Sequence, residues 1–417
     1  MDLNAVCFWL FCVFFTGYLV LEGFDYGVGM LLPFLGRADR ERQAMISTLA
    51  PVWEGNEVWL IAAGTVLFAG FPHVYATLFS GLYLALLLIL TSLILRGAAF
   101  AMRNRADDRR WRRFWDWALF GGGVIPAFLW GMAISGLLAG LPIDGEKQYT
   151  GTLGNLFSLY TLSGGLVFVL VFLLHGTVYL ALKMDEHFIL QLRKTGLITG
   201  KYALFTVAGF VVLTFIYTDL AGKPFASAVL AVAAVALALC YRYLRQGRYR
   251  RSFACSTLAI ITMTAAIFSG LFPRFIISSL NPEWNLSIYN AASNFLTLKI
   301  MTTTMAVVLP VVFILEGWKY YIFRQPVTAA ATGFERRRKL WRHLLIRVKQ
   351  LNNCAHNLSD ILEKAKNTIN TNQPQQTNYP LPVKAVQHIR EIKALLHRSH
   401  PLIGLLTKLV KLLSKAP

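Results

Sequence analysis

Apolar residues in this chain run in long, nearly uninterrupted blocks, and this pattern limits the possible folds more than any other feature. The blocks are about 20 residues long, which is the length a helix needs to cross a hydrocarbon layer of about 30 Å. Only 15% of the 417 residues are charged, whereas about a quarter are charged in typical soluble domains. Lipid cannot satisfy backbone amides, and the blocks lack the alternation of barrel strands, so each block is expected to be a helix.

The blocks predict about nine transmembrane helices. The expected positions are near 4–32, 56–71, 75–100, 115–140, 154–182, 199–218, 225–245, 253–273 and 293–323. Because few residues separate the second helix from the third, one long kinked segment is an alternative interpretation. We therefore predict an all-α, polytopic membrane protein over residues 1–325, followed by a basic cytoplasmic tail over residues 326–417 that is partly helical or interfacial.

The distribution of Lys and Arg favours nine helices over eight. The loops expected on one side hold 18 Lys and Arg, and the N-terminus and the loops on the other side hold 3. The basic loops are residues 33–51, 101–114, 183–201 and 241–251. Because basic loops stay in the cytoplasm, the N-terminus is expected outside and the C-terminus in the cytoplasm. Topology thus explains the basic residues of these loops better than nucleic-acid binding, whose motifs are missing.

Ionisable residues inside the helices are functional candidates, because a charge in lipid is costly. Glu22 and Asp25 lie three residues apart and share a helix face, and Glu54 and Glu57 repeat this spacing at the start of the second helix. On the predicted topology both pairs lie toward the cytoplasm, where they could pass protons inward. The alternative is that they are solvated helix ends or ion-pair partners, for instance of Arg96.

A haem would need axial ligands such as His or Met at membrane depth. Of the eight His residues, His175 alone lies well inside a predicted helix, where a lone His is more often packed and hydrogen-bonded than a ligand. The sequence has no Walker, dinucleotide-binding or HExxH motif, and its five Cys form no C-x-x-C pair. We expect no metal site in this chain and no catalysis by this chain alone.

Several segments carry a family resemblance. The strongest is GFDYGVGMLLPFLGRADRERQAMISTLAPVWEGNEVWLIAAGTVLFAGFPHVYA, with a GFD-GVG stretch, an Arg-containing loop and a W-D/E-GN-VW-I motif. It resembles subunit II of cytochrome bd-type quinol oxidases, and so do WDWALFGGGVIPAFLWG and ASNFLTLKIM further along. The resemblance covers about residues 1–325, and the short loop 219–224 is similar to the cyanide-insensitive branch. The basic tail departs from the family pattern.

The resemblance implies a non-haem subunit of a terminal oxidase in the bacterial inner membrane. Such an enzyme oxidises a quinol such as ubiquinol, reduces dioxygen to water and builds a proton gradient without pumping. Subunit I would carry haems b and d and the quinol site. Subunit II would form two four-helix bundles plus one peripheral helix, stabilise subunit I and help to form proton and oxygen routes. The family leaves room for a small single-helix subunit, and for a quinone or lipid bound to this chain.

The resemblance also assigns individual residues. Glu22 and Glu54 match acidic positions of the proton route, where other members can carry Asp. Asp25 matches the Asp of the GFD stretch, and Trp59 matches a Trp near the oxygen entry.

Two rival classes of membrane protein fit the sequence less well. Secondary transporters place ion sites at the midplane on broken helices, whereas the carboxylates here lie near one face. A proton-translocating dehydrogenase subunit would carry Lys and Glu repeatedly along its helices, and Lys299 and Glu316 alone do not supply such a chain.

Residues 335–417 hold 16 Lys and Arg against 4 Asp and Glu, so we expect this tail to lie on the anionic membrane surface. Each basic residue near that surface contributes up to about 1 kcal/mol, and a solvated extension is the alternative. A truncation after Thr328 should still assemble with subunit I and reduce oxygen at a near-normal rate. Loss of assembly in the truncated chain would show that the tail docks onto subunit I instead.

Overall fold

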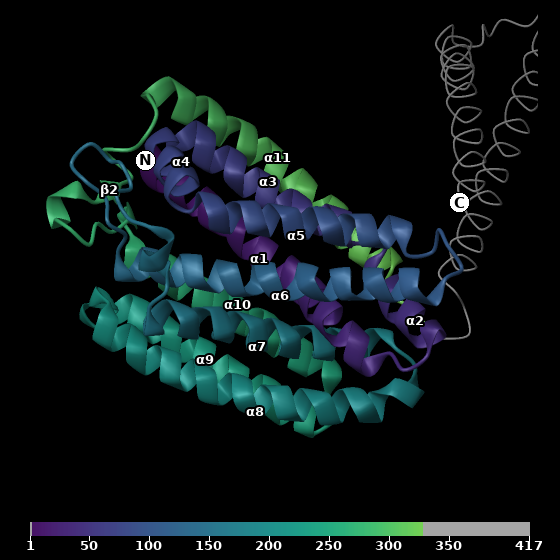
Figure 1. The fold of residues 1–417 in the computed structure, drawn as a ribbon. Helices are drawn as coiled ribbons and strands as arrows, with labels where there is room; N and C mark the ends of the chain where they lie inside the picture. Colours follow the sequence, from purple (N-terminus) through teal and green to yellow (C-terminus); the bar gives the residue numbers. More distant parts are fainter. Residues whose placement is uncertain (1, 328–417) are drawn as a thin grey trace, which may run out of the picture. The chain divides into compact units, whose positions relative to one another are not determined.

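The computed structural model describes residues 2–327, and the long elements of this part are all α-helices (Figure 1). The predicted tail lies outside the described residues from position 328 onward. The helices are α1 (Leu3–Leu35), α2 (Asp39–Leu49), α3 (Trp53–Gly70), α4 (Pro72–Gly81), α5 (Tyr83–Met102), α6 (Arg109–Ala139), α7 (Leu159–Lys183), α8 (Glu186–Tyr217), α9 (Pro224–Arg245), α10 (Tyr249–Leu271) and α11 (Phe295–Ile322). A two-stranded antiparallel hairpin, β1 (Arg274–Ile276) and β2 (Leu286–Ser287), precedes α11.

The number of spans agrees with the sequence. Within the described part, eight helices are long and apolar enough to cross a membrane. The pair α3 and α4 raises the number to nine, and its two helices are bent by 119° relative to each other. The prediction of an all-helical protein with about nine spans is therefore confirmed.

Several predicted helix boundaries are wrong. The expected third helix, 75–100, is two helices, because α4 already ends at Gly81 and α5 begins at Tyr83. Pro72 starts α4 at a position where its missing N–H costs nothing, so the expected turn at 71–74 is largely helical. In the same way, α8 begins thirteen residues before the expected position 199. Hydropathy identifies the apolar part of a helix that lies in the membrane. It does not detect a polar extension of the same helix.

The spans form two groups of four, with α11 beside the first. In the first group α3 and α6 pack on α1, and α5 packs on α6; in the second, α7, α8, α9 and α10 pack on one another. Contacts of α1 with α7 join the groups at Gly27 and Gly176, where a Cβ atom on either residue would meet the backbone of the other helix. Small residues of this kind let membrane helices approach closely. The arrangement matches the expected two four-helix bundles plus one helix.

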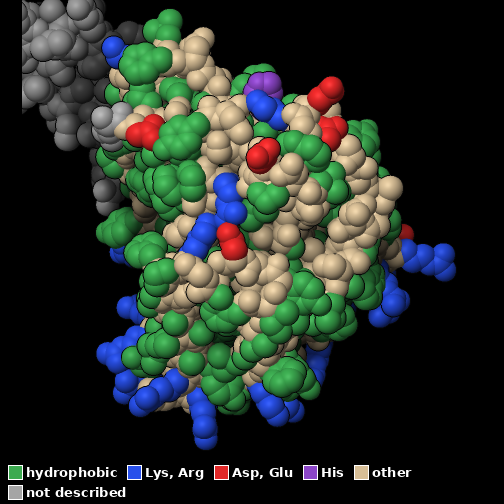
Figure 2. Space-filling view, turned by 90° about the vertical axis from the view of Figure 1, so that its left-hand side faces the viewer, with side chains coloured by type: hydrophobic (Ala, Val, Ile, Leu, Met, Phe, Trp, Pro, Cys, Tyr) green, Lys and Arg blue, Asp and Glu red, His purple; other side chains and the backbone are tan. Residues whose placement is uncertain are grey.

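The connections gather at two ends of the bundle (Figure 1). The N-terminus, α4 and the β1–β2 hairpin lie at one end, and α2 lies at the other. Figure 2 looks onto the first end, where hydrophobic side chains are numerous, a few charged side chains lie among them, and Lys and Arg gather along the lower edge of the view. The loops are thus divided between the two ends of the bundle, as expected if successive loops alternate between the two sides of a membrane. The assignment of the basic end to the cytoplasm stays a prediction.

An ion network around the buried Arg103 and Asp116, which the sequence did not predict, holds α2, α5 and α6 together at the basic end. Arg103, which follows α5, donates to Asp116 of α6 at 2.6 Å and to Asp39 of α2 at 2.7 Å. Asp116 also pairs with Arg42 of α2 at 3.0 Å. Burial alone would lower the pKa of Arg103, but its hydrogen bonds and the charges of the two Asp residues raise that pKa. The guanidinium therefore stays charged and fixes the start of α6.

Candidate functional site

Glu22, Glu57 and Arg96 meet where α1, α3 and α5 approach one another. Arg96 is 1% exposed; its Nη1 lies 2.6 Å from Oε2 of Glu22, and its Nη2 lies 2.8 Å from Oε1 of Glu57. Glu22 is fully buried, whereas the side chain of Glu57 is 27% exposed. The guanidinium also lies over the ring of Tyr26, 4.9 Å from its centroid. Arg96 is thus the ion-pair partner that the sequence suggested, and it bridges one carboxylate of each predicted pair.

Asp25 lies close to Glu22 along α1 and is equally buried. Its Oδ2 accepts a hydrogen bond from Nδ2 of Asn56 on α3 at 2.9 Å. Within residues 2–327, its other oxygen, Oδ1, has no hydrogen-bond partner, and neither does Oε1 of Glu22. Buried polar atoms are almost always hydrogen-bonded. Two buried carboxylate oxygens on one face of α1 therefore lack a hydrogen-bond partner within the described part of the chain.

Asn56 is a central residue of this site that the sequence analysis missed. Its Oδ1 accepts from the hydroxyl of Tyr320 at 2.7 Å and from Nζ of Lys319 at 3.3 Å. Both donors come from the last turn of α11, where Lys319 also pairs with Glu316 at 2.5 Å. The available signal was the Asn between the two Glu residues of the WEGNEVW motif. An uncharged amide is easily overlooked, and its two partners on α11 lie more than 260 residues away in the sequence.

Two predicted residues lie outside the cluster. Glu54 is exposed on the first turn of α3, and no hydrogen bond or ion pair ties its side chain to the described part of the chain. Trp59 is buried between Phe14 and Phe313, with ring centroids 5.9 and 5.5 Å away. Its Nε1 has no hydrogen-bond partner among residues 2–327.

Acidic groups outnumber basic groups in the cluster. Glu22, Asp25 and Glu57 face the single guanidinium of Arg96, because the ammonium of Lys319 is already paired with Glu316. An unpaired buried charge costs several kcal/mol, and such groups usually become neutral instead. A proton on one of the carboxylates lowers the excess from two negative charges to one, so this arrangement can hold a proton and exchange it.

His175 is the packed, hydrogen-bonded residue that the sequence favoured. The side chain is fully buried, and its Nε2 donates to the carbonyl oxygen of Val20 at 3.2 Å. Its Nδ1 lies 2.7 Å from Oγ of Ser256. Both ring nitrogens are therefore engaged within the chain. Across residues 2–327, His, Cys, Asp and Glu form no group that could hold a metal ion.

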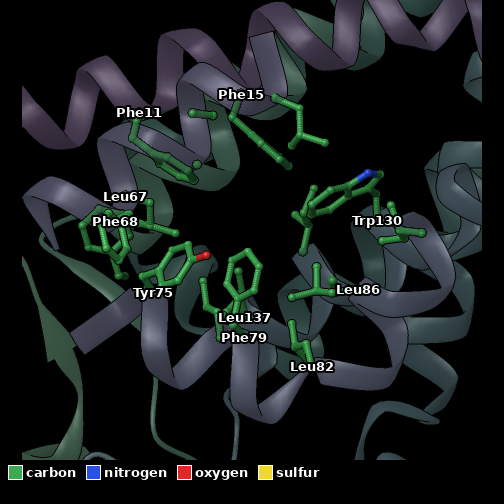
Figure 3. A pocket seen from close by; sticks show the side chains of 18 of the residues that line it. Phe11, Phe15, Leu67, Phe68, Tyr75, Phe79, Leu82, Leu86, Trp130 and Leu137 are labelled. Carbon is green, nitrogen blue, oxygen red and sulfur yellow. The ribbon is translucent and has the colours of Figure 1, made fainter. Parts of the chain in front are cut away.

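A second feature is an apolar cavity of about 600 Å³ in the first bundle, lined by α1, α3, α4, α5, α6 and α10. Figure 3 shows aromatic side chains of α1, α4 and α6 around it, among them Phe15, Tyr75 and Trp130. Nε1 of Trp130 donates to the hydroxyl of Tyr18 at 3.1 Å, and that hydroxyl is hydrogen-bonded to Tyr26. A chain of aromatic residues thus connects the cavity wall to the residue beneath Arg96.

Comparisons with known proteins identify relatives over the whole helical part. The family described as Cytochrome bd terminal oxidase subunit II matches residues 3–323. The chain is 32% identical over 331 residues to the cytochrome bd ubiquinol oxidase subunit 2 of Bacillus subtilis, covering 78% of this chain and 97% of that one. It is 34% identical over 346 residues to the cytochrome bd-I ubiquinol oxidase subunit 2 of Escherichia coli K12, covering 74% and 91%. The family match ends before the predicted tail.

A solved structure shares the fold. The bd oxidase from Geobacillus thermodenitrificans has a chain that covers 77% of this chain and 97% of its own length, with a TM-score of 0.62 at 18% sequence identity.

Replacing Arg96 by Met should destabilise the protein, because Glu22 would lose its buried counter-charge. Breaking one partner of a buried ion pair typically costs about 3–5 kcal/mol, so the melting temperature of the purified protein should fall clearly. The double variant Arg96→Met/Glu22→Gln should recover much of this loss, because it removes both buried charges. Arg105→Met, which changes an exposed Arg beyond α5, is the control. Equal losses in the single and double variants would contradict the pairing.

Proposed function

This chain belongs to the family of cytochrome bd terminal oxidase subunit II, and we propose that its buried carboxylate cluster conducts protons toward the oxygen-reducing site of the complex. As subunit II of a cytochrome bd ubiquinol oxidase, it is a multi-span membrane protein of the respiratory chain and part of a bd oxidase complex. We place haems b and d and the quinol site in subunit I, with which this chain pairs. A small single-helix subunit is a further proposed partner.

The observation that carries the proposal is the gradation of exposure along the acidic residues. Glu54 is exposed, Glu57 is partly exposed, and Glu22 and Asp25 are buried with free carboxylate oxygens. Arg96 connects the partly exposed Glu57 to the buried Glu22. Carboxyl groups exchange protons readily, either directly or through a bridging water. The series can therefore take protons from the basic end of the bundle, which we assign to the cytoplasm, into its interior.

Trp59 stays the proposed residue of the oxygen entry. Its indole lies among apolar rings of α1 and α11, through which a small apolar molecule such as dioxygen can pass.

The proton route can be tested with the nearly isosteric substitutions Glu22→Gln and Glu54→Gln in the assembled oxidase. Each should slow oxygen reduction and leave the haem content unchanged, because an amide cannot exchange a proton as a carboxyl group does. Oxygen consumption with excess quinol is the measurement. Glu283→Gln, an exposed acid in the β1–β2 hairpin at the opposite end, is the matched control. Normal turnover in both single variants and in the double variant would remove the proposed role.

We also propose that the apolar cavity binds a quinone tail or the acyl chain of a lipid. Its volume and its almost wholly apolar lining suit a long hydrocarbon chain, and the exposed side chains of Ile61, Phe68 and Leu90 lie at its edge.

Filling the cavity tests this second proposal. Gly64 lines the cavity, and a Cβ atom there would have no neighbour within 4 Å; Gly64→Leu should therefore fit the fold and occupy the space of the ligand. Gly209→Leu is the matched control, because Gly209 of α8 is equally open and lies away from the cavity. Mass spectrometry of organic extracts should find less quinone or lipid with the Gly64→Leu oxidase than with the control. Equal amounts would exclude the cavity as the binding site.

A further inference from the structure

The side-chain amide of Asn56 is fully buried, and its orientation follows from its partners. Lys319 can only donate a hydrogen bond, so the amide atom facing it must be Oδ1. The carbonyl oxygen of Leu21 can only accept, so the atom 3.4 Å from it must be Nδ2. Tyr320 supplies the second hydrogen bond to Oδ1, and Asp25 receives the second from Nδ2. Every hydrogen-bonding position of the amide is occupied.

This orientation makes the two oxygens of Asp25 unequal. Oδ2 must accept from the amide N–H, so it cannot carry a proton toward Asn56. Oδ1 has no hydrogen-bond partner among residues 2–327. When Asp25 is protonated, the proton therefore resides on Oδ1, the oxygen that is free to exchange it.

Asn56 also separates two opposite charges. Nζ of Lys319 lies 3.3 Å from one end of the amide, and Oδ2 of Asp25 lies 2.9 Å from the other end. A direct ion pair would hold Asp25 in its ionised form, because an opposite charge at short range favours the charged state. With the amide between them, Lys319 instead pairs with Glu316 and donates to the carbonyl oxygen of Val52.

We propose that Asn56 is a positioning residue of the proton route, which directs the exchangeable proton to Oδ1 of Asp25 and keeps Lys319 from pairing with that carboxylate. The inference rests on the proposed function, because it concerns how one member of the route is held. The end of α11 takes part through Tyr320 and Lys319, which lock the amide in place. A helix at the edge of the first bundle thereby controls a carboxyl group on α1.

The test uses the assembled oxidase and two measurements, oxygen reduction and infrared difference spectra of protonated carboxyl groups. The band that disappears in Asp25→Asn belongs to Asp25. In Asn56→Ala that band should shift or vanish, since its C=O group loses a hydrogen bond. Turnover should fall about tenfold, because Lys319 is then free to pair with Asp25 and hold it in its ionised form, and haem content should not change.

Two further variants separate positioning from packing. Asn56→Ala/Lys319→Met should regain a large part of the turnover, because the cation that would capture Asp25 is gone. Tyr320→Phe should lower turnover about threefold by loosening the amide without removing its bulk. Tyr321→Phe is the matched control, because this neighbouring ring is exposed, and it should have no effect.

The outcomes distinguish the inference from the proton route itself. A slow Asp25→Asn oxidase together with a normal rate and an unshifted band in Asn56→Ala would overturn the role of Asn56 and leave the route intact. Equal loss in Asn56→Ala and in its double variant with Lys319→Met would also overturn it. A normal rate in Asp25→Asn would remove Asp25 from the route, and the inference would fall with it.

Discussion

Arg96 is buried between Glu22 and Glu57, and its ion pairs connect three helices of the first bundle. A charge at this depth is tolerated only with partners, because removing one partner leaves the other uncompensated. The same guanidinium gives the site its shape. It holds Glu22 beside Asp25, stacks on Tyr26, and leaves the cluster with more acidic groups than it can neutralise.

The excess of acidic groups has a consequence for function. A balanced ion-pair network, such as Arg103 and Arg42 with Asp116 and Asp39, is suited to fixing helices and has little reason to exchange protons. The Glu22 cluster instead combines free carboxylate oxygens with a graded path to the surface. The two networks lie in the same bundle and use the same residue types. They differ in charge balance, which suits the Arg103 network to a structural role and the Glu22 cluster to the proposed role in proton transfer.

Much of this arrangement could be predicted from the sequence. The lengths of the apolar blocks gave the helices, the basic loops gave their alternation, and the three-residue spacing placed Glu22 and Asp25 on one helix face. Arg96 followed as the basic residue at the matching depth. What could not be predicted depended on tertiary contacts. Asn56 is uncharged, and its partners Lys319 and Tyr320 lie on α11. Glu54 is exposed on the first turn of α3, and spacing alone does not show how deeply the start of a helix is buried.

On the proposed route, protons consumed in oxygen reduction pass through the carboxylates around Arg96. The most direct measurement is proton uptake by the fully reduced oxidase during a single reaction with oxygen, followed with a pH-sensitive dye alongside the haem spectra. Asp25→Asn should slow proton uptake and the haem transitions coupled to it, while the initial binding of oxygen keeps its normal rate. Proton uptake in Asp25→Asn at the rate of the unmodified oxidase would show that the protons take another route.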